Sequence, residues 1–207
     1  MTPHGQEWQE HAHVDQYREY ADTIPHRGEG ETVVVELLPK RVRRVLDIGT
    51  GDGRLLSIVL AARPGAEGIG LDFSPPMLAA ASKRVTTVEH DFSTPLPDLG
   101  GAFDAIVSSF AIHHVDDARK QELYREVFAL LEPGGIFLNL EHVASATPRL
   151  HTEFYDAIGQ AAEDDDPSNQ LALVEDQLDW LRGIGFDDVD CMWKWRELAL
   201  LQGRKPA

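Results

Sequence analysis

The sequence predicts a doubly wound α/β fold, in which a mostly parallel sheet of seven strands has helices on both faces and ends in an antiparallel hairpin. Three observations support this prediction. Short apolar strands alternate with helical segments over residues 42–141, a pattern typical of parallel strands joined by right-handed crossovers. A glycine-rich turn stops the first strand. The last two predicted strands have a short connection, residues 194–196, so they must pair antiparallel.

Local signals support the individual elements. Segment 42–48 is rich in β-branched residues, as expected of a buried strand. Helix 75–84 begins with two prolines, which a first helical turn accepts. Helix 117–131 is followed by Glu-Pro-Gly-Gly at 132–135, a combined stop and turn signal. The other expected strands are 67–72, 86–90, 103–109, 136–141, 186–193 and 197–203, and the other expected helices are 6–20, 29–38, 54–62, 148–161 and 171–183.

The chain of 207 residues suits one domain over 1–207. Within it we expect residues 1–28 to form a helical lid and residues 145–183 a helical insertion. The C-terminal hairpin follows, and its Trp193 and Trp195 are expected either to pack or to face a substrate or partner. The acidic stretch 163–166 is expected to be a solvated loop.

Composition narrows the function classes. The net charge of −16 disfavours nucleic acid and anionic membrane surfaces as partners. The single cysteine excludes an internal disulfide, which fits a cytoplasmic protein. No apolar run reaches the roughly 18 residues of a membrane span, and the N-terminus lacks a secretion signal. We expect a monomer or homodimer that acts on a small molecule.

The clearest motif is the turn at 49–53, where three of five residues are glycine. Glycines between a strand and a helix let the backbone approach a ligand closely. In an open α/β sheet, ligands bind beyond the carboxyl ends of the strands, where this turn lies. Asp72 ends the next strand, 21 residues after Gly51, and a carboxylate there suits a ribose diol. The motif therefore predicts a nucleoside-containing ligand; the alternative is that the glycines only make a tight turn.

Details of the turn decide between nucleoside ligands. The dinucleotide fingerprint needs glycine where Arg54 stands, and no Gly-Lys-Ser/Thr triplet of a P-loop occurs. Asp47 and Asp52 flank the turn, and two carboxylates are unfavourable beside a pyrophosphate. They are favourable beside an amine and a cation. A nucleoside that carries an amino acid and a positive sulfur, S-adenosylmethionine, fits these requirements.

Five segments in order resemble the successive motifs of class I S-adenosylmethionine-dependent methyltransferases. They are residues 45–55, 70–78, 89–92, 103–115 and 130–140. The resemblance implies the Rossmann-like methyltransferase fold, with seven strands of which the last is antiparallel. It also implies S-adenosyl-L-methionine as cofactor and S-adenosyl-L-homocysteine as product.

The resemblance also implies roles for single residues. Around the methionine half and the sulfonium it places Asp47, Gly49, Thr50, Gly51, Ser109 and Phe110. Around the ribose and the adenine it places Asp72, Phe73, Met77, Asp91 and Phe92. The aromatic and thioether groups suit a flat polarizable ring, although core packing is their alternative role. For Asp91 the alternative is a turn cap.

Further candidates lie near the expected mouth of the site. Arg27, with Tyr17, Tyr20 and His26 in the lid, is placed to pair with the carboxylate of the cofactor; its alternative is a solvated side chain. Glu141, His142 and Arg149 follow the fifth parallel strand and are either pocket or surface residues.

His113 and His114 follow strand 103–109 directly and are the candidate catalytic residues. An imidazole titrates near neutral pH, so one of them is expected to act as general base toward the acceptor. Their alternative is a capping or packing role.

Departures from the family's patterns restrict the acceptor. No Asn/Asp-Pro-Pro-aromatic motif follows strand 103–109, which disfavours amide or exocyclic nitrogens of nucleic acid. No Asp/Asn metal cluster is recognisable, so metal independence is expected. We therefore expect methyl transfer to an O, N, S or C nucleophile of a small molecule. The alternatives are a non-catalytic cofactor-binding protein and a methyltransferase for transfer RNA or protein.

Overall fold

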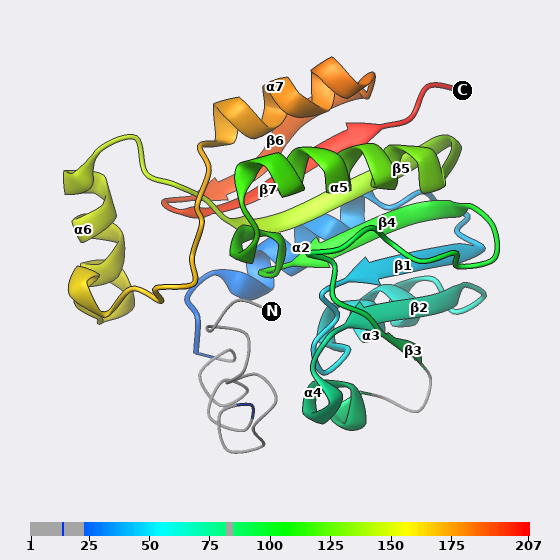
Figure 1. Cartoon of the computed structure of the whole chain (residues 1–207), viewed down its shortest axis with the longest axis horizontal. Helices are drawn as coiled ribbons and strands as arrows, with labels where there is room; N and C mark the ends of the chain where they lie inside the picture. The colour runs from blue at the N-terminus through cyan, green and yellow to red at the C-terminus, as the bar shows by residue number, and fades with distance from the viewer. Residues whose placement is uncertain (1–13, 15–22, 82–84) are drawn as a thin grey trace.

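The computed structural model describes residues 14, 23–81 and 85–207. Its centre is one seven-stranded sheet with the order β3-β2-β1-β4-β5-β7-β6 (Figure 1). The strands are β1 (Arg44–Ile48), β2 (Glu67–Asp72), β3 (Thr86–Glu89), β4 (Phe103–Ser109), β5 (Leu131–His142), β6 (Asp187–Trp195) and β7 (Leu198–Arg204). Strands β1 to β5 pair in parallel, and β7 runs antiparallel to both β5 and β6. The predicted fold class is confirmed.

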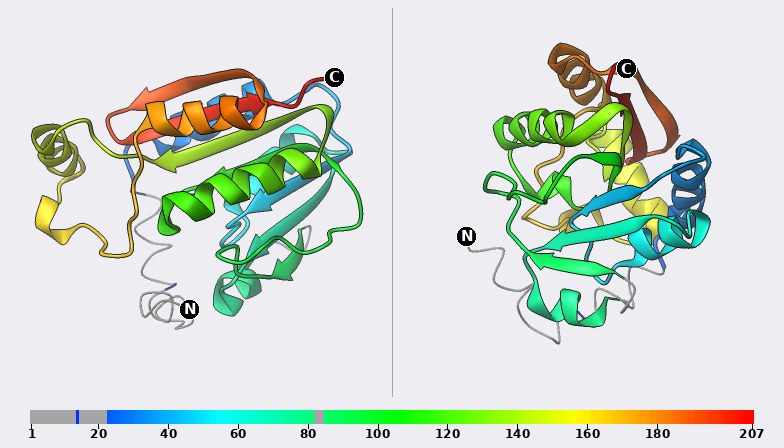
Figure 2. Two further views of the ribbon diagram at one scale, coloured as in Figure 1. Left: turned by 45° about the horizontal axis from the view of Figure 1, so that its top comes forward. Right: turned by 90° about the vertical axis from the view of Figure 1, so that its right-hand side faces the viewer.

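Helices cover the sheet on both faces (Figure 2). The helices are α2 (Arg27–Leu37), α3 (Arg54–Ala62), α4 (Pro75–Ala80), α5 (Asp117–Leu130), α6 (Pro148–Ile158) and α7 (Val174–Ile184), with short 3-10 turns η3 (Ile112–His114) and η4 (Ala162–Asp164). Adjacent residues of β1 serve different faces: Val45 packs in the core under α2 and α3, whereas Leu46 packs in the core under α5 and α7. A strand buried on both faces explains the continuous apolar run.

The strand order places the ligand-binding end of the sheet. From β1 the chain first builds outward through β2 to β3 and then crosses to β4 and β5 on the other side of β1. The direction of winding therefore reverses between β1 and β4. At such a switch point the loops that leave neighbouring strands diverge and open a crevice beyond the carboxyl ends of those strands.

Local chemistry explains several helix ends. Ser74 accepts a hydrogen bond from the Met77 amide at the start of α4, and Asp116 accepts one from the Arg119 amide at the start of α5. Gly159 ends α6 in the left-handed conformation, which halts that helix earlier than the predicted residue 161.

Several boundaries differ from those predicted. Strand β5 starts directly after α5, and the pairing register shifts between Phe103 and Ala105, so the predicted turn at 132–135 is an irregularity inside the strand. Helix α7 starts at Val174 and not at 171, because the backbone carbonyl of Ala172 instead accepts from Ala144. The hairpin connection is shorter than predicted, with only residues 196–197 between β6 and β7.

Two predicted helices fall partly or wholly beyond the described ranges. Helix α4 ends at Ala80, and residues 82–84 of the predicted helix 75–84 lie outside the description. The predicted helix 6–20, apart from Val14, and most of the lid at 1–28 lie outside it as well. Among the described residues, no helix has the length and apolar composition needed to cross a bilayer.

Candidate functional site

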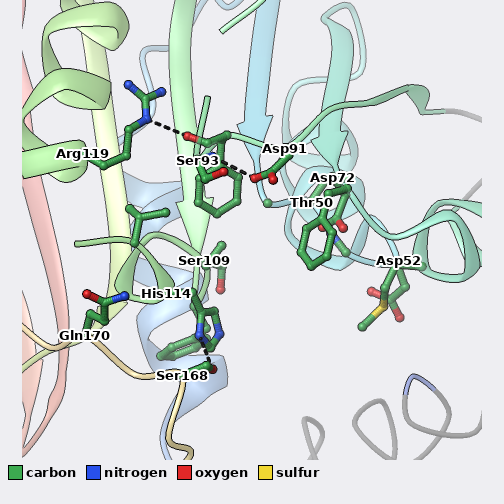
Figure 3. A pocket seen from close by; sticks show the side chains of 18 of the residues that line it. Thr50, Asp52, Asp72, Asp91, Ser93, Ser109, His114, Arg119, Ser168 and Gln170 are labelled. Atoms are coloured by element: carbon green, nitrogen blue, oxygen red, sulfur yellow. Dashed lines mark hydrogen bonds between the residues drawn. The ribbon is translucent and has the colours of Figure 1, made fainter. Parts of the chain in front are cut away.

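A cavity of about 470 Å³ lies beyond the carboxyl ends of β1, β2 and β4, on the switch point of the sheet (Figure 3). Its volume falls in the range of small-molecule sites. The residues that line it are Arg27, Gly49, Thr50, Gly51, Asp52, Asp72, Phe73, Met77, Asp91, Phe92, Ser93, Ser109, Phe110, Ala111, His114, Val115, Asp116, Arg119, Ser168 and Gln170.

The glycine turn forms the floor of this cavity. Gly49 and Gly51 have φ values of +70° and +54°, in the left-handed region that favours glycine. A Cβ at Gly49 would lie 2.2 Å from the Cβ of Ala111, so no side chain fits there. A Cβ at Gly51 would meet only the Met77 sulfur, at 3.9 Å. The backbone at Gly51 is therefore accessible to a ligand.

Asp72 connects the second strand to the turn. Its Oδ2 accepts a hydrogen bond of 2.8 Å from the Gly51 amide, and its Oδ1 accepts one of 2.9 Å from the Ser74 amide. The side chain is buried against the cavity, and this burial raises the pKa of the carboxyl above its usual value. Asp72 therefore shapes the turn and also presents a carboxylate to the cavity.

Asp47 lies beneath the turn and does not line the cavity. It is fully buried, and its Oδ2 accepts a 2.8 Å hydrogen bond from the Thr50 hydroxyl. Within the described residues its Oδ1 has no hydrogen-bond partner. Burial raises the pKa of this carboxyl to about 7. Asp47 therefore lies behind the cavity surface. The resemblance implied a place for it around the methionine half of the cofactor, which includes the amino group.

One end of the cavity is apolar. Phe73, Met77 and Phe92 line it, and the last two are almost fully buried. Asp91 lies beside them, and its Oδ1 accepts a 2.9 Å hydrogen bond from the Ser93 amide. Asp91 is therefore both a turn cap, as its alternative role proposed, and a carboxylate at the edge of an apolar slot.

The charges around the cavity fit a cationic ligand better than a phosphorylated one. Four carboxylate side chains and two guanidinium groups line it: Asp52, Asp72, Asp91, Asp116, Arg27 and Arg119. At the end of β4, the buried hydroxyl of Ser109 has no hydrogen-bond partner among the described residues. An open backbone turn, an apolar slot with an acid at its edge and a polar group left for a ligand fit S-adenosylmethionine.

Arg27 is buried and faces the cavity, so the solvated alternative is wrong. Its side chain is 9% exposed, and its Nε donates to Glu31 at 3.1 Å. Glu31 also accepts from Arg54, at 2.7 and 3.0 Å, so one buried carboxylate joins helix α2 to the start of α3. The guanidinium carbon of Arg27 lies 5.3 Å from the ring centroid of Phe110.

Only one of the two candidate histidines lines the cavity. His114 does, and its Nδ1 lies 3.0 Å from the Ser168 hydroxyl (Figure 3). Burial and the neighbouring His113 lower the pKa of His114 to about 3. His114 is thus a neutral imidazole at physiological pH.

His113 lies behind His114, with 4.0 Å between the ring centroids. Its Nδ1 is 2.6 Å from Oε1 of Glu141, and both side chains are buried. Burial lowers the pKa of His113 well below its usual value and raises the pKa of Glu141 to about 7. When Glu141 is ionised, its carboxylate accepts the Nδ1 proton of a neutral His113.

The remaining candidates do not line the cavity. His142 bonds the buried Glu197 at 3.0 Å, and Arg149 is exposed and lies 3.8 Å from Glu153. Trp195 packs against His26 and Phe154. The tyrosines predicted for the lid, Tyr17 and Tyr20, lie outside the described residues.

Sequence reasoning missed one wall of the cavity, formed by the segment before α7. Ser168 and Gln170 line the cavity, and the Gln170 amide donates to the His113 carbonyl at 2.8 Å. The preceding acidic stretch is held in place, because Asp165 accepts from Tyr155 and Asn169. Composition indicated a solvated loop here; Glu163 is exposed, whereas Asp165 and Asp166 are half-buried. No local motif marks Ser168 or Gln170, so only the folded chain reveals them.

Arg119 and Asp116 were also missed. The Asp116 signal was available, because an Asp before a predicted helix is a standard N-cap.

Across the described ranges, no group of three or more His, Cys, Asp or Glu side chains is arranged to hold a metal ion.

Comparison with known proteins agrees with this geometry. The family model described as "Methyltransferase domain" matches residues 45–135. A demethylmenaquinone methyltransferase of Thermus thermophilus is 40% identical over 114 residues, which cover 50% of this chain and 49% of that protein. An uncharacterized methyltransferase of Anoxybacillus flavithermus is 32% identical over 152 residues, which cover 72% of this chain and 65% of that protein. The chain thus spans about half to two thirds of these relatives.

Solved structures show the same fold. An O-methyltransferase family protein from Burkholderia thailandensis superimposes with a TM-score of 0.73 and 23% identity, over 94% of this chain and 60% of that one. Human N-acetylserotonin methyltransferase, solved in complex with S-adenosylmethionine, gives a TM-score of 0.70 and 19% identity, over 98% of this chain and 59% of that one. Together with the sheet order and the matched residues 45–135, these comparisons show that the chain belongs to the class I S-adenosylmethionine-dependent methyltransferases.

Proposed function

We propose that the protein transfers a methyl group from S-adenosylmethionine to a small-molecule acceptor. The observation that carries this proposal is the Gly51–Asp72 hydrogen bond at the floor of a cavity that has an apolar slot on one side and a neutral histidine on the other. The cofactor, when bound, supplies an electrophilic methyl group on a positively charged sulfur. The protein's task is then to bind, orient and exclude water.

The chain's own residues divide that task. Asp72 is assigned the ribose hydroxyls, and Phe73 and Met77 the faces of the adenine. Asp91 is assigned the exocyclic amine of the adenine. Arg27 is assigned the carboxylate of the methionine part, because a buried guanidinium is a strong, directional partner for a carboxylate.

The remaining groups that face the sulfonium come from the end of β4. Ser109 and Phe110 line the cavity there, as Gly51 does. Asp47 supports the turn from below through Thr50. Its Oδ1 has no hydrogen-bond partner among the described residues, which leaves an acceptor behind the position assigned to the amino group.

We assign the acceptor contact to His114. Its ring lines the cavity and is neutral, so it accepts a hydrogen bond from an acceptor hydroxyl, amine or thiol. His113, hydrogen-bonded to Glu141, backs this ring at 4.0 Å and fixes its position. His113 is thus a positioning residue for His114, and a pKa of about 3 suits the His114 imidazole to accept a hydrogen bond from the acceptor rather than to hold its proton.

A small acceptor is favoured by size and charge. The cavity of about 470 Å³ is partly enclosed by the segment that carries Ser168, and the net charge of −16 opposes nucleic acid. Names of similar proteins include a demethylmenaquinone methyltransferase and an O-methyltransferase family protein, which makes phenolic and quinol compounds the first acceptors to test.

Cofactor binding is tested by calorimetry with S-adenosylhomocysteine. The wild type should bind, and Asp72→Asn should lose about 1.5–3 kcal/mol of binding free energy, the typical cost of removing a hydrogen bond to a charged group. Asp104→Asn is the matched control, because Asp104 is a carboxylate near the opposite end of β4 that bonds Arg43 and does not line the cavity.

Turnover is tested by release of S-adenosylhomocysteine with a panel of phenols, quinols, amines and thiols. Release that depends on a panel compound supports the proposal. Tight cofactor binding without release from any compound would instead indicate a non-catalytic binding protein. Labelled methyl transferred to bulk RNA or lysate protein, with a rate that falls steeply with salt, would indicate a macromolecular acceptor.

A further inference from the structure

The segment between β3 and β4, residues 90–102, contains no helix or strand. Its first part carries Asp91, Phe92 and Ser93, which line the apolar end of the cavity. A segment of this length without regular structure needs side-chain contacts to hold one conformation. The positions of these three side chains in the cavity therefore depend on the contacts that hold the segment.

Arg119 of α5 holds its first part. The Nε of Arg119 donates to the Phe92 carbonyl at 2.8 Å, and one terminal nitrogen donates to the Thr94 carbonyl at 2.8 Å. The side chain is 9% exposed and lines the cavity beside Asp91 and Ser93 (Figure 3). The guanidinium is thus hydrogen-bonded to the backbone on both sides of Ser93.

Glu126, two turns further along α5, binds both Arg119 and the segment. Its carboxylate accepts two hydrogen bonds from Arg119, at 2.6 and 2.9 Å, and one from the Leu96 amide at 3.0 Å. The acid orients the guanidinium and also binds the segment itself. Helix α5 therefore fixes the segment at three alternate residues.

The turn that carries Asp91 lies within this held stretch. The Asp91 carboxylate accepts from the Ser93 amide at 2.9 Å, and the Asp91 carbonyl accepts from the Thr94 amide at 3.0 Å. The backbone of Phe92 and Thr94 cannot shift without breaking the Arg119 bonds. The position of the Asp91 carboxylate is thus coupled to Arg119.

A second arginine holds the far part of the same segment. Arg44 of β1 donates to the carbonyls of Leu99, Gly100 and Ala102, at 3.0, 3.2 and 3.1 Å. Arg44 does not line the cavity. The two arginines do the same kind of structural work on one segment, but only one of them adjoins the ligand site.

We propose that Arg119 is a positioning residue for base recognition, which holds Asp91 and Phe92 where they distinguish an amino purine from an oxo purine. This inference rests on the proposed function, since it assumes an adenosyl ligand. A site that discriminates by one hydrogen bond needs its acceptor held to a fraction of an ångström. Loss of the Arg119 bonds lets the Asp91 carboxylate drift, and discrimination then falls together with affinity.

The test compares S-adenosylhomocysteine with S-inosylhomocysteine, which carries an oxo group in place of the exocyclic amine. Binding of both is measured by calorimetry for the wild type, Arg119→Gln, Arg119→Lys and Arg44→Gln. The wild type should prefer the adenosyl compound by on the order of tenfold, the value of one hydrogen bond.

In Arg119→Gln, the dissociation constant of S-adenosylhomocysteine should rise on the order of tenfold, and the preference should shrink to roughly twofold. Arg119→Lys keeps a cation able to reach one carbonyl and should restore part of the preference. Arg44→Gln should lower the melting temperature and leave the preference unchanged. With an acceptor in hand, the KM for the cofactor should rise in Arg119→Gln while kcat changes little.

Three outcomes would overturn the inference while leaving the proposed function in place. They are a wild type that binds both compounds equally, an Arg119→Gln protein that keeps the full preference, and an equal loss of preference in Arg44→Gln. If Arg119→Gln does not fold, Glu126→Gln gives the same test from the other side of the ion pair. A wild type that binds neither compound refutes the proposed function itself.

Discussion

At the scale of single residues, several side chains of the site have two partners and therefore two jobs. Glu31 serves Arg27 and Arg54, Asp72 serves the amides of Gly51 and Ser74, and Glu141 serves His113 and the amide of His142. Glu31 and Asp72 each tie a cavity residue to a neighbouring element, and Glu141 ties His113, which lies behind the cavity residue His114, to β5. A substitution at such a residue changes shape and chemistry together, so each variant of this kind needs a matched control.

Arg27→Met tests the contact that is assigned to the cofactor carboxylate. Glu31 keeps Arg54 as its partner in this variant, so no buried charge is left unpaired. Affinity for S-adenosylhomocysteine should fall on the order of tenfold, because a charge-assisted hydrogen bond is lost. Affinity for 5′-methylthioadenosine, which has no carboxylate, should stay the same. Calorimetry with both ligands checks this, and Arg43→Met, at an exposed arginine outside the cavity, serves as the control.

Glu141 predicts a pH dependence of turnover. Burial raises its pKa to about 7, so the carboxyl is protonated below pH 7 and no longer accepts the His113 proton as an anion. The rate at saturating substrate should therefore fall as the pH drops through about 7. In Glu141→Gln this fall should be absent and the rate uniformly lower.

The control for that pH profile is Glu197→Gln. Glu197 is another buried carboxylate that holds two histidines, His142 and His151, but their hydrogen bonds keep its pKa below the usual value. It does not titrate near pH 7, so its amide variant should keep the wild-type profile. A fall through pH 7 that survives in Glu141→Gln would contradict the assignment.

At the scale of elements, the glycine turn connects strand β1 to helix α3 and forms the cavity floor. Three glycines with positive φ set its backbone conformation. Two hydrogen bonds also hold it, one from the Thr50 amide to the Leu71 carbonyl and one from the Gly51 amide to the Asp72 carboxylate. The elements around it are strand ends and helix starts, which other parts of the sheet hold in place. A local change at the turn should therefore affect binding more than folding.

Gly51→Ala and Gly100→Ala test that statement as a matched pair. Both glycines have positive φ, +54° and +72°, and neither has an atom closer than 3.9 Å to an added Cβ. Each variant should lose about 1–2 kcal/mol of unfolding free energy from backbone strain alone. Only Gly51→Ala should weaken binding of S-adenosylhomocysteine, because only Gly51 faces the cavity. Denaturant unfolding and calorimetry measure the two effects separately.

At the scale of the whole molecule, buried carboxylates make the free protein sensitive to pH. Asp47 and Glu141 have folded-state pKa values of about 7, above the ordinary values of 3.8 and 4.5. The folded protein thus holds more protons than the unfolded chain between about pH 4 and 7, so these groups lower stability as the pH rises through that window. Carboxylates with lowered pKa, such as Asp104, act in the opposite direction.

The contribution of one group is therefore measured as a difference between proteins. Asp47→Asn should gain melting temperature relative to the wild type as the pH rises from 5 to 8, because the amide avoids the cost of a buried charge. At pH 4 the melting temperature of Asp47→Asn should show no gain over the wild type. A constant offset between the two proteins at all pH values would contradict the raised pKa. Asp98→Asn, at a carboxylate in the irregular segment 90–102 and outside the cavity, provides the control.

The elements were predictable where their signals are local. Strands 67–72 and 103–109 and helix 54–62 have the predicted bounds, because glycine, aspartate and alternating hydrophobicity mark them within a few residues. The start of β5 was not predictable, since its irregular pairing with β4 depends on a partner strand far away in the sequence. The structure of residues 171–173 was not predictable either, since a hydrogen bond from the Ala144 amide to the Ala172 carbonyl stands there in place of a helical turn.

Local patterns along the chain were enough to indicate the fold class, the glycine turn and its acidic partner, because each depends on signals within a few residues of a strand, a turn or a helix. The roles of Arg119, Ser168 and Glu31, the burial of Asp47, and the choice of His114 over His113 as the residue facing the cavity emerged only from the folded molecule. They depend on which side chains from distant segments meet at one edge of the sheet. Packing and hydrogen bonding in three dimensions decide that, and no periodicity in the sequence records it.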